Sequence, residues 1–195
     1  MKIFVTGTRG IPGIPGGVEK HCQELYPLIA AKGHEVTVAT RTPYLHNRSR
    51  SWQGIRLAHT FAPRLKSLEA IVHTFIAVLK ACLANPDVVH IHAIGPGLIV
   101  PFARALGLKV VVTNHGPEYD RHKWSWAANT ILMLGEYLGG KFANEVIVIS
   151  NEIAGTIRKR CGREPNRIYN GVQILARSKN KDYLELKGIV PNNYI

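Results

Sequence analysis

The sequence predicts an α/β domain with a doubly wound, mostly parallel sheet and helices on both faces. Short runs rich in Val and Ile alternate with longer segments in which apolar residues recur every three or four positions. Strands separated by helices form βαβ units, and strands that are apolar on both sides belong to a covered parallel sheet. The 195 residues suffice for one core, since folding at this length buries roughly 70% of the unfolded surface.

The first half of the chain begins with a predicted strand at Lys2–Thr6. An apolar stripe that starts at Val18 predicts a helix ending before Gly33, and Pro27 inside it predicts a kink or a break. The other elements expected in this half are strands at Glu35–Thr40 and Gly54–Thr60 and a helix at Leu65–Ala84.

The second half continues the same alternation. Its predicted elements are strands at Asp87–His92, Lys109–Thr113, Glu145–Ser150 and Arg167–Tyr169 and helices at Pro96–Leu106, Trp124–Phe142 and Asn151–Arg160. Ligands of doubly wound sheets bind beyond the carboxyl ends of the strands. This rule points to four segments, which are Gly7–Gly17, His92–Gly97, Asn114–Lys123 and Ser150–Asn151.

The composition narrows the class of protein. The 25 Lys and Arg exceed the 13 Asp and Glu, giving a formal charge of +12, which suits nucleic acid, an anionic membrane face or phosphorylated small molecules as partners. Basic residues gather in segments 41–68 and 158–181. The three cysteines offer no disulfide framework, and neither a signal peptide nor a membrane span is recognisable, so we expect a cytoplasmic protein.

The loop Gly7–Gly17 is the first candidate site. We expect Gly16 and Gly17 to let backbone N–H groups approach a phosphate or a sugar at the N-terminus of the following helix. The spacing matches neither the dinucleotide fingerprint nor the P-loop, and a Gly/Pro loop without a ligand is the alternative. Glu19 would complement the helix N-terminus or hold an acceptor hydroxyl.

Histidines at strand ends form the second candidate site. His115 directly follows a predicted strand, where an imidazole can bond a substrate hydroxyl or stabilise developing charge. Glu118 lies in the same polar loop, which is either a binding surface or a solvated charged loop. We expect His90 and His92, which alternate along one strand, to face opposite sides, so that they form no metal pair and only His92 reaches the cleft.

The apolar residues of Leu65–Ala84 are interpreted as the core-facing side of a helix, with docking on an anionic membrane surface as the alternative. Trp124 and Trp126 are likewise expected in core or interface packing.

Four motifs in order resemble the N-terminal domain of the retaining glycosyltransferases of family four, which have the GT-B fold. They are KIFVTGTRGIPGIPGGVEKHCQEL at the start, NHG after a β-run, VIVIS before a helix, and RIYNGV, together spanning about residues 1–172. The TRGIP and NHGPEYDRHKW stretches are similar to bacterial members proposed to transfer rhamnose or related sugars in polysaccharide assembly.

The resemblance implies that residues 1–176 are an acceptor-side lobe and residues 177–195 an interdomain linker leading into a missing C-terminal lobe. A sugar would pass with retention from a nucleotide-sugar donor to a glycan or lipid-linked acceptor, and the isolated lobe would be inactive. His115 would be catalytic, and Asn170 would lie in the turn before the linker. No metal and no cofactor are expected.

Two other functions stay open. One is a nucleotide-sugar epimerase lobe of similar fold, which would act without an acceptor. The other is a non-enzymatic basic module that binds nucleic acid or anionic lipid. Because the basic residues are not interleaved with aromatics and no nucleic-acid motif occurs, we expect no nucleic-acid partner. Peripheral association with the inner membrane face is compatible with the transferase.

Overall fold

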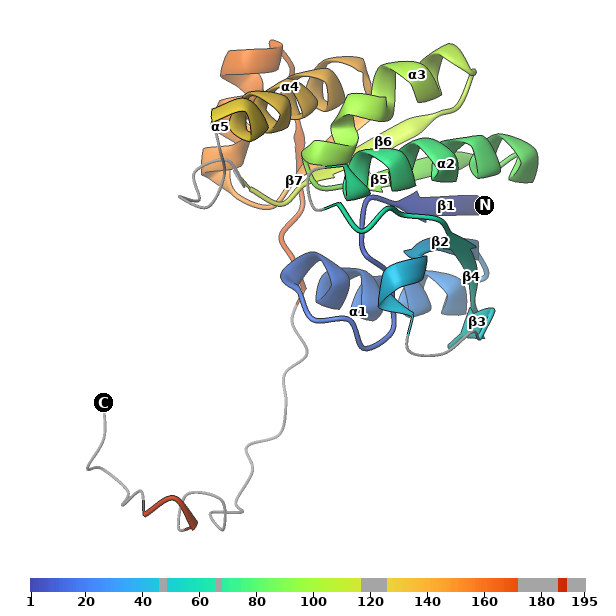
Figure 1. Ribbon diagram of the computed structural model, residues 1–195. Helices are drawn as coiled ribbons and strands as arrows, with labels where there is room; N and C mark the ends of the chain where they lie inside the picture. The colour runs from blue at the N-terminus through green and yellow to red at the C-terminus, as the bar shows by residue number, and fades with distance from the viewer. Residues whose placement is uncertain (46–48, 66–67, 117–125, 172–185, 189–195) are drawn as a thin grey trace.

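A computed structural model of the protein describes residues 1–45, 49–65, 68–116, 126–171 and 186–188 (Figure 1). These residues form one sheet of eight strands in the order β3-β4-β2-β1-β5-β6-β7-β8, in which only β3 and β4 pair antiparallel. The strands are β1 (Lys2–Thr6), β2 (Glu35–Arg41), β3 (Ser51–Trp52), β4 (Ile55–Thr60), β5 (Val88–His92), β6 (Val110–Asn114), β7 (Glu145–Val148) and β8 (Asn166–Arg167). The predicted mostly parallel α/β fold is confirmed.

Helices cover both faces of this sheet (Figure 1). One face carries α1 (Gly17–Ala31), and the other carries α2 (Glu69–Ala84), α3 (Val100–Ala105), α4 (Trp126–Phe142) and α5 (Asn151–Cys161). Two short 3₁₀ helices, η1 (Thr42–Tyr44) and η2 (Gly95–Ile99), complete the described elements. The strand order reverses between β1 and β5, and a ligand crevice is expected at such a switch point.

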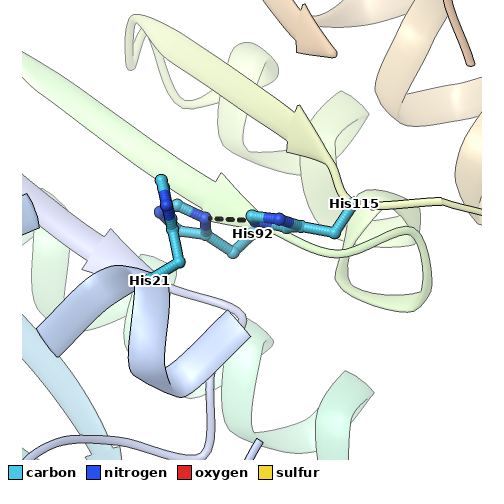
Figure 2. Close-up of side chains that lie close together, drawn as sticks. All are labelled: His21, His92 and His115. Carbon is cyan, nitrogen blue, oxygen red and sulfur yellow. Dashed lines mark hydrogen bonds between the residues drawn. The ribbon is translucent and has the colours of Figure 1, made fainter. Parts of the chain in front are cut away.

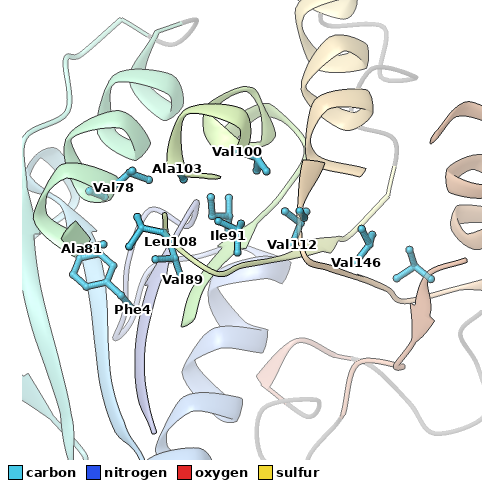
Figure 3. Packing of buried hydrophobic residues seen from close by; sticks show 14 of the residues in the cluster. Phe4, Val78, Ala81, Val89, Ile91, Val100, Ala103, Leu108, Val112 and Val146 are labelled. Atoms are coloured by element: carbon cyan, nitrogen blue, oxygen red, sulfur yellow. The ribbon is translucent and has the colours of Figure 1, made fainter. Parts of the chain in front are cut away.

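Each face of the sheet has its own apolar core, because successive residues of a strand point to opposite sides. Phe4 belongs to the core under α2, whereas its neighbour Val5 belongs to the core under α1. The larger core, drawn in Figure 3, joins the central strands to α2, α3 and α5. A fully buried Val or Ile side chain stabilises the fold by about 1.5–3 kcal/mol, so these two layers hold the strand ends in place.

Several predicted boundaries differ from the structure. Pro27 does not break α1, which runs through it as one helix. Proline removes a single N–H donor there, while Cys22 and Tyr26, both fully buried, pack the helix against the sheet. The helix predicted at Pro96–Leu106 is split into η2 and α3, and the strand β3 was not predicted.

The interpretation of Leu65–Ala84 as a helix with its large apolar side chains in the core is wrong. The buried residues of α2 are small or polar and include Thr74, Ala77 and Ala81. By contrast, Phe75 is 40%, Leu79 is 41% and Leu83 is 89% exposed. The small residues occupy the buried side of α2 because they let the helix lie close to the sheet beneath it.

Helix α4 repeats this arrangement. It buries Gly135, Gly139 and Gly140 and exposes large apolar side chains. Trp126, which was expected in packing, is 83% exposed, so that prediction is also wrong for Trp126, while Trp124 lies outside the described residues. We call Phe75, Leu79 and Leu83 of α2 together with Ile131, Leu134 and Tyr137 of α4 the outer apolar residues. Among the described residues, every helix is too short or too polar to cross a bilayer.

Candidate functional site

The candidate site lies at the carboxyl edge of the sheet, beside the switch point between β1 and β5. The loop after β1 leads into the N-terminus of α1, β5 ends at His92, and His115 follows β6 directly. Three of the four predicted segments therefore meet at one edge, although the structure describes only the first part of the third.

A chain of hydrogen bonds connects the core under α1 to this edge. The hydroxyl of Tyr26 lies 2.9 Å from Nδ1 of His90 and 2.5 Å from Nε2 of His92. His92 in turn bonds through Nδ1 to Nε2 of His115 at 3.0 Å, and Nε2 of His90 bonds to Oγ1 of Thr113 at 2.7 Å. Both ring nitrogens of His92 are thus occupied, and the orientation of His115 depends on groups that lie beneath it.

The expectation that His90 and His92 face opposite sides is wrong. Residues i and i+2 of a strand share a face, and the two rings stack with centroids 4.3 Å apart. Both rings point toward α1, where Tyr26 joins them. The prediction that His92 lies at the strand end is confirmed, but it is fully buried and reaches the site through its bond to His115.

Burial keeps these histidines uncharged. It lowers the pKa of His90 to about 3 and the pKa of His115 to about 4. It also lowers the pKa of His92 well below the ordinary value, and neighbouring histidines add to each shift. A neutral imidazole has one N–H donor and one bare nitrogen that accepts. At neutral pH His115 therefore serves as an oriented hydrogen-bonding group, not as a fixed cation.

His21 is the third ring at this edge, and the sequence-based predictions did not include it among the site residues. It projects from the second turn of α1 toward the other two rings (Figure 2). Its centroid is 5.3 Å from that of His115 and 5.9 Å from that of His92. One ring nitrogen from each of the three residues lies within 4.8 Å of the others.

The glycine-rich loop is held by an internal ion pair. Glu19 is buried, and its carboxylate accepts hydrogen bonds from the backbone N–H of Arg9 at 3.0 Å and from the Arg9 guanidinium at 3.0 and 3.1 Å. Burial opposes ionisation of Glu19, but the bonds from Arg9 outweigh it and lower the pKa of the carboxyl. Glu19 thus shapes the loop, and the acceptor hydroxyl suggested for it competes with Arg9.

Gly16 and Gly17 take different places in this loop. Gly16 has φ +148°, and a Cβ on it would collide with the side chains of Glu19 and Arg9, so the ion pair requires glycine there. Gly17 is the exposed first residue of α1, with nothing within 4 Å of an added Cβ. No side chain caps the helix at Gly16. The Glu19 carboxylate accepts from its own backbone N–H, so the N–H groups of Gly17 and Val18 are the ones that an anion could bind.

The last two predicted site residues are Glu118 and Asn170. Glu118 lies outside the described residues. Asn170 is exposed and precedes Gly171, which lines a separate cavity of about 610 Å³ along the outer side of α1. His21 also lines this cavity, so it is the connection between the cavity and the strand edge.

Comparison with known families decides the class of the chain. Residues 15–174 match the family described as Glycosyltransferase Family 4. The chain belongs to this family. No curated protein matches the sequence of this family 4 chain.

Solved structures share the fold of this family 4 chain at low identity. Sucrose-phosphate synthase from Thermosynechococcus elongatus superposes with a TM-score of 0.67 at 16% identity over 86% of the chain and 47% of its own length. HepE of Anabaena, solved with UDP and glucose, gives 0.60 at 18% identity over 96% and 49%. Arabidopsis thaliana starch synthase IV, bound to ADP and acarbose, gives 0.61 at 12% identity over 88% and 51%. The chain thus spans about half of each of these proteins, and the match confirms the predicted Rossmann-like lobe.

Part of the basic charge of this family 4 chain has partners within the fold where the structure describes it. Arg41 is buried and paired with Glu69 at 2.9 Å. Arg158 binds Glu164, Arg160 binds Glu136, and Arg163 donates to the last carbonyls of α4. Several basic residues of these two segments are therefore bonded within the described part of the fold.

Proposed function

We propose that this chain is the acceptor-side half of a glycosyltransferase that moves a sugar from a nucleotide-sugar donor to a glycan or lipid-linked acceptor. Family membership supports sugar transfer. The observation that carries the proposal is the position of His115, which lies at the strand edge in a fixed orientation, bonded to buried His92. The glycine-rich loop at the same edge leads into the N-terminus of α1, which no side chain caps.

The proposed chemistry follows from these groups. Nδ1 of His115 takes no part in the bond to His92, so it is left to bond a sugar hydroxyl near the reacting carbon. The N–H groups at the start of α1 would stabilise negative charge that develops on the leaving diphosphate. We further propose retention of configuration, residues 177–195 as the linker to a donor-binding domain, and a role in surface polysaccharide synthesis, all from the family resemblance.

A transfer assay tests this proposal. The chain joined to its donor-binding domain should convert a nucleotide sugar and an acceptor to a glycoside, and proton NMR of the anomeric centre should show the configuration of the donor. The 195-residue chain alone should give no product. An epimerised nucleotide sugar formed without an acceptor would contradict the proposal and favour the epimerase alternative.

We also propose that the protein acts at the inner membrane face, because the outer apolar residues place exposed Phe and Leu side chains on a strongly basic chain. Sedimentation with anionic vesicles should exceed that with neutral vesicles. Leu83→Ser should reduce it, whereas Leu28→Ser, which changes a 65% exposed residue of α1 on the opposite face, should not. Equal sedimentation with both vesicle types would remove this part of the proposal.

A further inference from the structure

We propose that His21, His92 and His115 form a binding site for a transition-metal ion of the Zn²⁺ class. The three side chains come from α1, from the last residue of β5 and from the residue after β6, and they converge at one point (Figure 2). The inference does not depend on sugar transfer, and it departs from the expectation that the sequence offers no metal cluster.

The chemistry of the donors suits such an ion. Imidazole nitrogen is a preferred ligand of Zn²⁺, Co²⁺, Ni²⁺ and Cu²⁺, and it binds in its uncharged form. Burial favours that form, and His92 is fully buried while the other two rings are partly covered. Three imidazoles leave one position of a tetrahedral ion open for water or another ligand.

The distances are compatible with coordination. Zn–N bonds of about 2.0–2.1 Å place two nitrogens of a tetrahedral ion about 3.3 Å apart. Nδ1 of His92 and Nε2 of His115 already lie 3.0 Å apart. The three ligand atoms lie within 4.8 Å of one another, and rotation of the half-buried His21 ring would bring its nitrogen to the other two.

The network behind His92 supplies what a metal ligand requires from its surroundings. A coordinating histidine usually donates its second N–H to a fixed acceptor, which sets the tautomer and the ring orientation. Nε2 of His92 has such a partner in the Tyr26 hydroxyl at 2.5 Å, and that hydroxyl is held in turn by His90 at 2.9 Å. With the proton of His92 on Nε2, its Nδ1 is free to bind the ion in place of the present bond to His115.

Cobalt titration of the 195-residue chain, prepared without a histidine tag, tests the site. One equivalent of Co²⁺ should produce a visible absorption band of tetrahedral intensity, and Zn²⁺ should displace it. His21→Ala should abolish the band, since His21 makes no bond within the His92 network. Far-UV circular dichroism of this variant should match that of the wild type.

Two further variants keep the test decisive. His34→Ala removes a histidine of the loop before β2 and should leave the affinity unchanged. Tyr26→Phe should weaken cobalt binding by about 10- to 100-fold, the usual effect of losing an outer partner of a ligand. The proposal is overturned if the wild type gives no band, or if the band persists undiminished in His21→Ala.

Discussion

The two faces of the sheet pack their helices with different kinds of buried residues. Under α1, the fully buried side chains include Tyr26 and His92, which are large, polar and hydrogen-bonded to each other. On the opposite face, α2 and α4 bury mainly Ala, Gly, Thr and Val and leave large apolar side chains outside. The first face depends on directed bonds that end at His115, whereas the second depends on close approach between helices.

This difference predicts two kinds of sensitivity. A hydrogen-bonded network fails when one polar atom is removed, because the partner left behind is buried without a bond. A close-packed layer fails when volume is added, because helices in backbone contact have no room to adjust. The following substitutions separate these two behaviours.

The largest effect is expected at the end of the network under α1. In the complete transferase, His115→Ala should lower kcat by about 10²- to 10⁴-fold, since it removes an oriented group at the reacting sugar. Initial rates at saturating donor measure the effect. His34→Ala, outside the site, is the control, and a His115→Ala rate equal to that of the control would exclude a catalytic role.

A large loss of stability is expected where backbones meet on the second face. A Cβ on Gly97 would collide with the carbonyl of Gly135, so Gly97→Ala should lower the free energy of unfolding by about 3 kcal/mol. Urea denaturation measures the change. Gly155→Ala in α5 is the matched control, because an added Cβ there meets nothing within 4 Å and should stabilise the helix by about 0.5–1 kcal/mol.

All strands but the two-residue β3 could be predicted from the sequence, but which side of the helices faces outward could not. Runs such as KVVV and EVIV have no polar side to expose, so they specify a covered sheet. In α2 and α4 the small residues and the large apolar residues both recur at helical spacing. Periodicity alone does not say which stripe faces inward, because that depends on how closely a neighbouring helix approaches.

The candidate site was predictable at its edge and not in its interior. His115 and the glycine loop follow strand ends, and the rule for parallel sheets places them together. Tyr26 is 64 residues from His90 and 66 residues from His92 in the sequence, so no local sequence pattern predicts these contacts. His21 reaches the site because of the angle at which α1 packs about its own axis on the sheet. The contacts of Tyr26 beneath the helix set that angle.

Removal of one hydroxyl should have a smaller effect than the glycine collision. Tyr26→Phe leaves the ring in place but deprives the buried His92 and the partly buried His90 of their shared partner, so it should cost about 2 kcal/mol of unfolding free energy. Tyr137→Phe, on the 40% exposed Tyr137 of α4, should change stability by less than about 0.5 kcal/mol. Equal effects in urea denaturation would contradict the contrast between the two faces.

The smallest effect concerns a buried histidine on the α2 face. His73 is fully buried, and within the part of the chain that the structure describes neither of its ring nitrogens is hydrogen-bonded. Burial, with Arg41 and Lys80 nearby, lowers its pKa to about 3 from the ordinary 6.5. Below pH 6.5 the unfolded chain binds a proton at His73 that the folded chain does not, so stability present at neutral pH is lost as the pH falls toward 3.

His73→Leu isolates this contribution. At about pH 5.5 the wild type should have lost about 1 kcal/mol through His73, and the variant should lack that loss. His90, His92 and His115 also have lowered pKa values, so both proteins should still weaken in acid, the variant less steeply. Urea denaturation between neutral pH and about pH 5.5 measures the two slopes. Parallel slopes would mean that His73 is protonated in the folded chain, and the α2 face would then not be the dry, close-packed layer that its buried residues indicate.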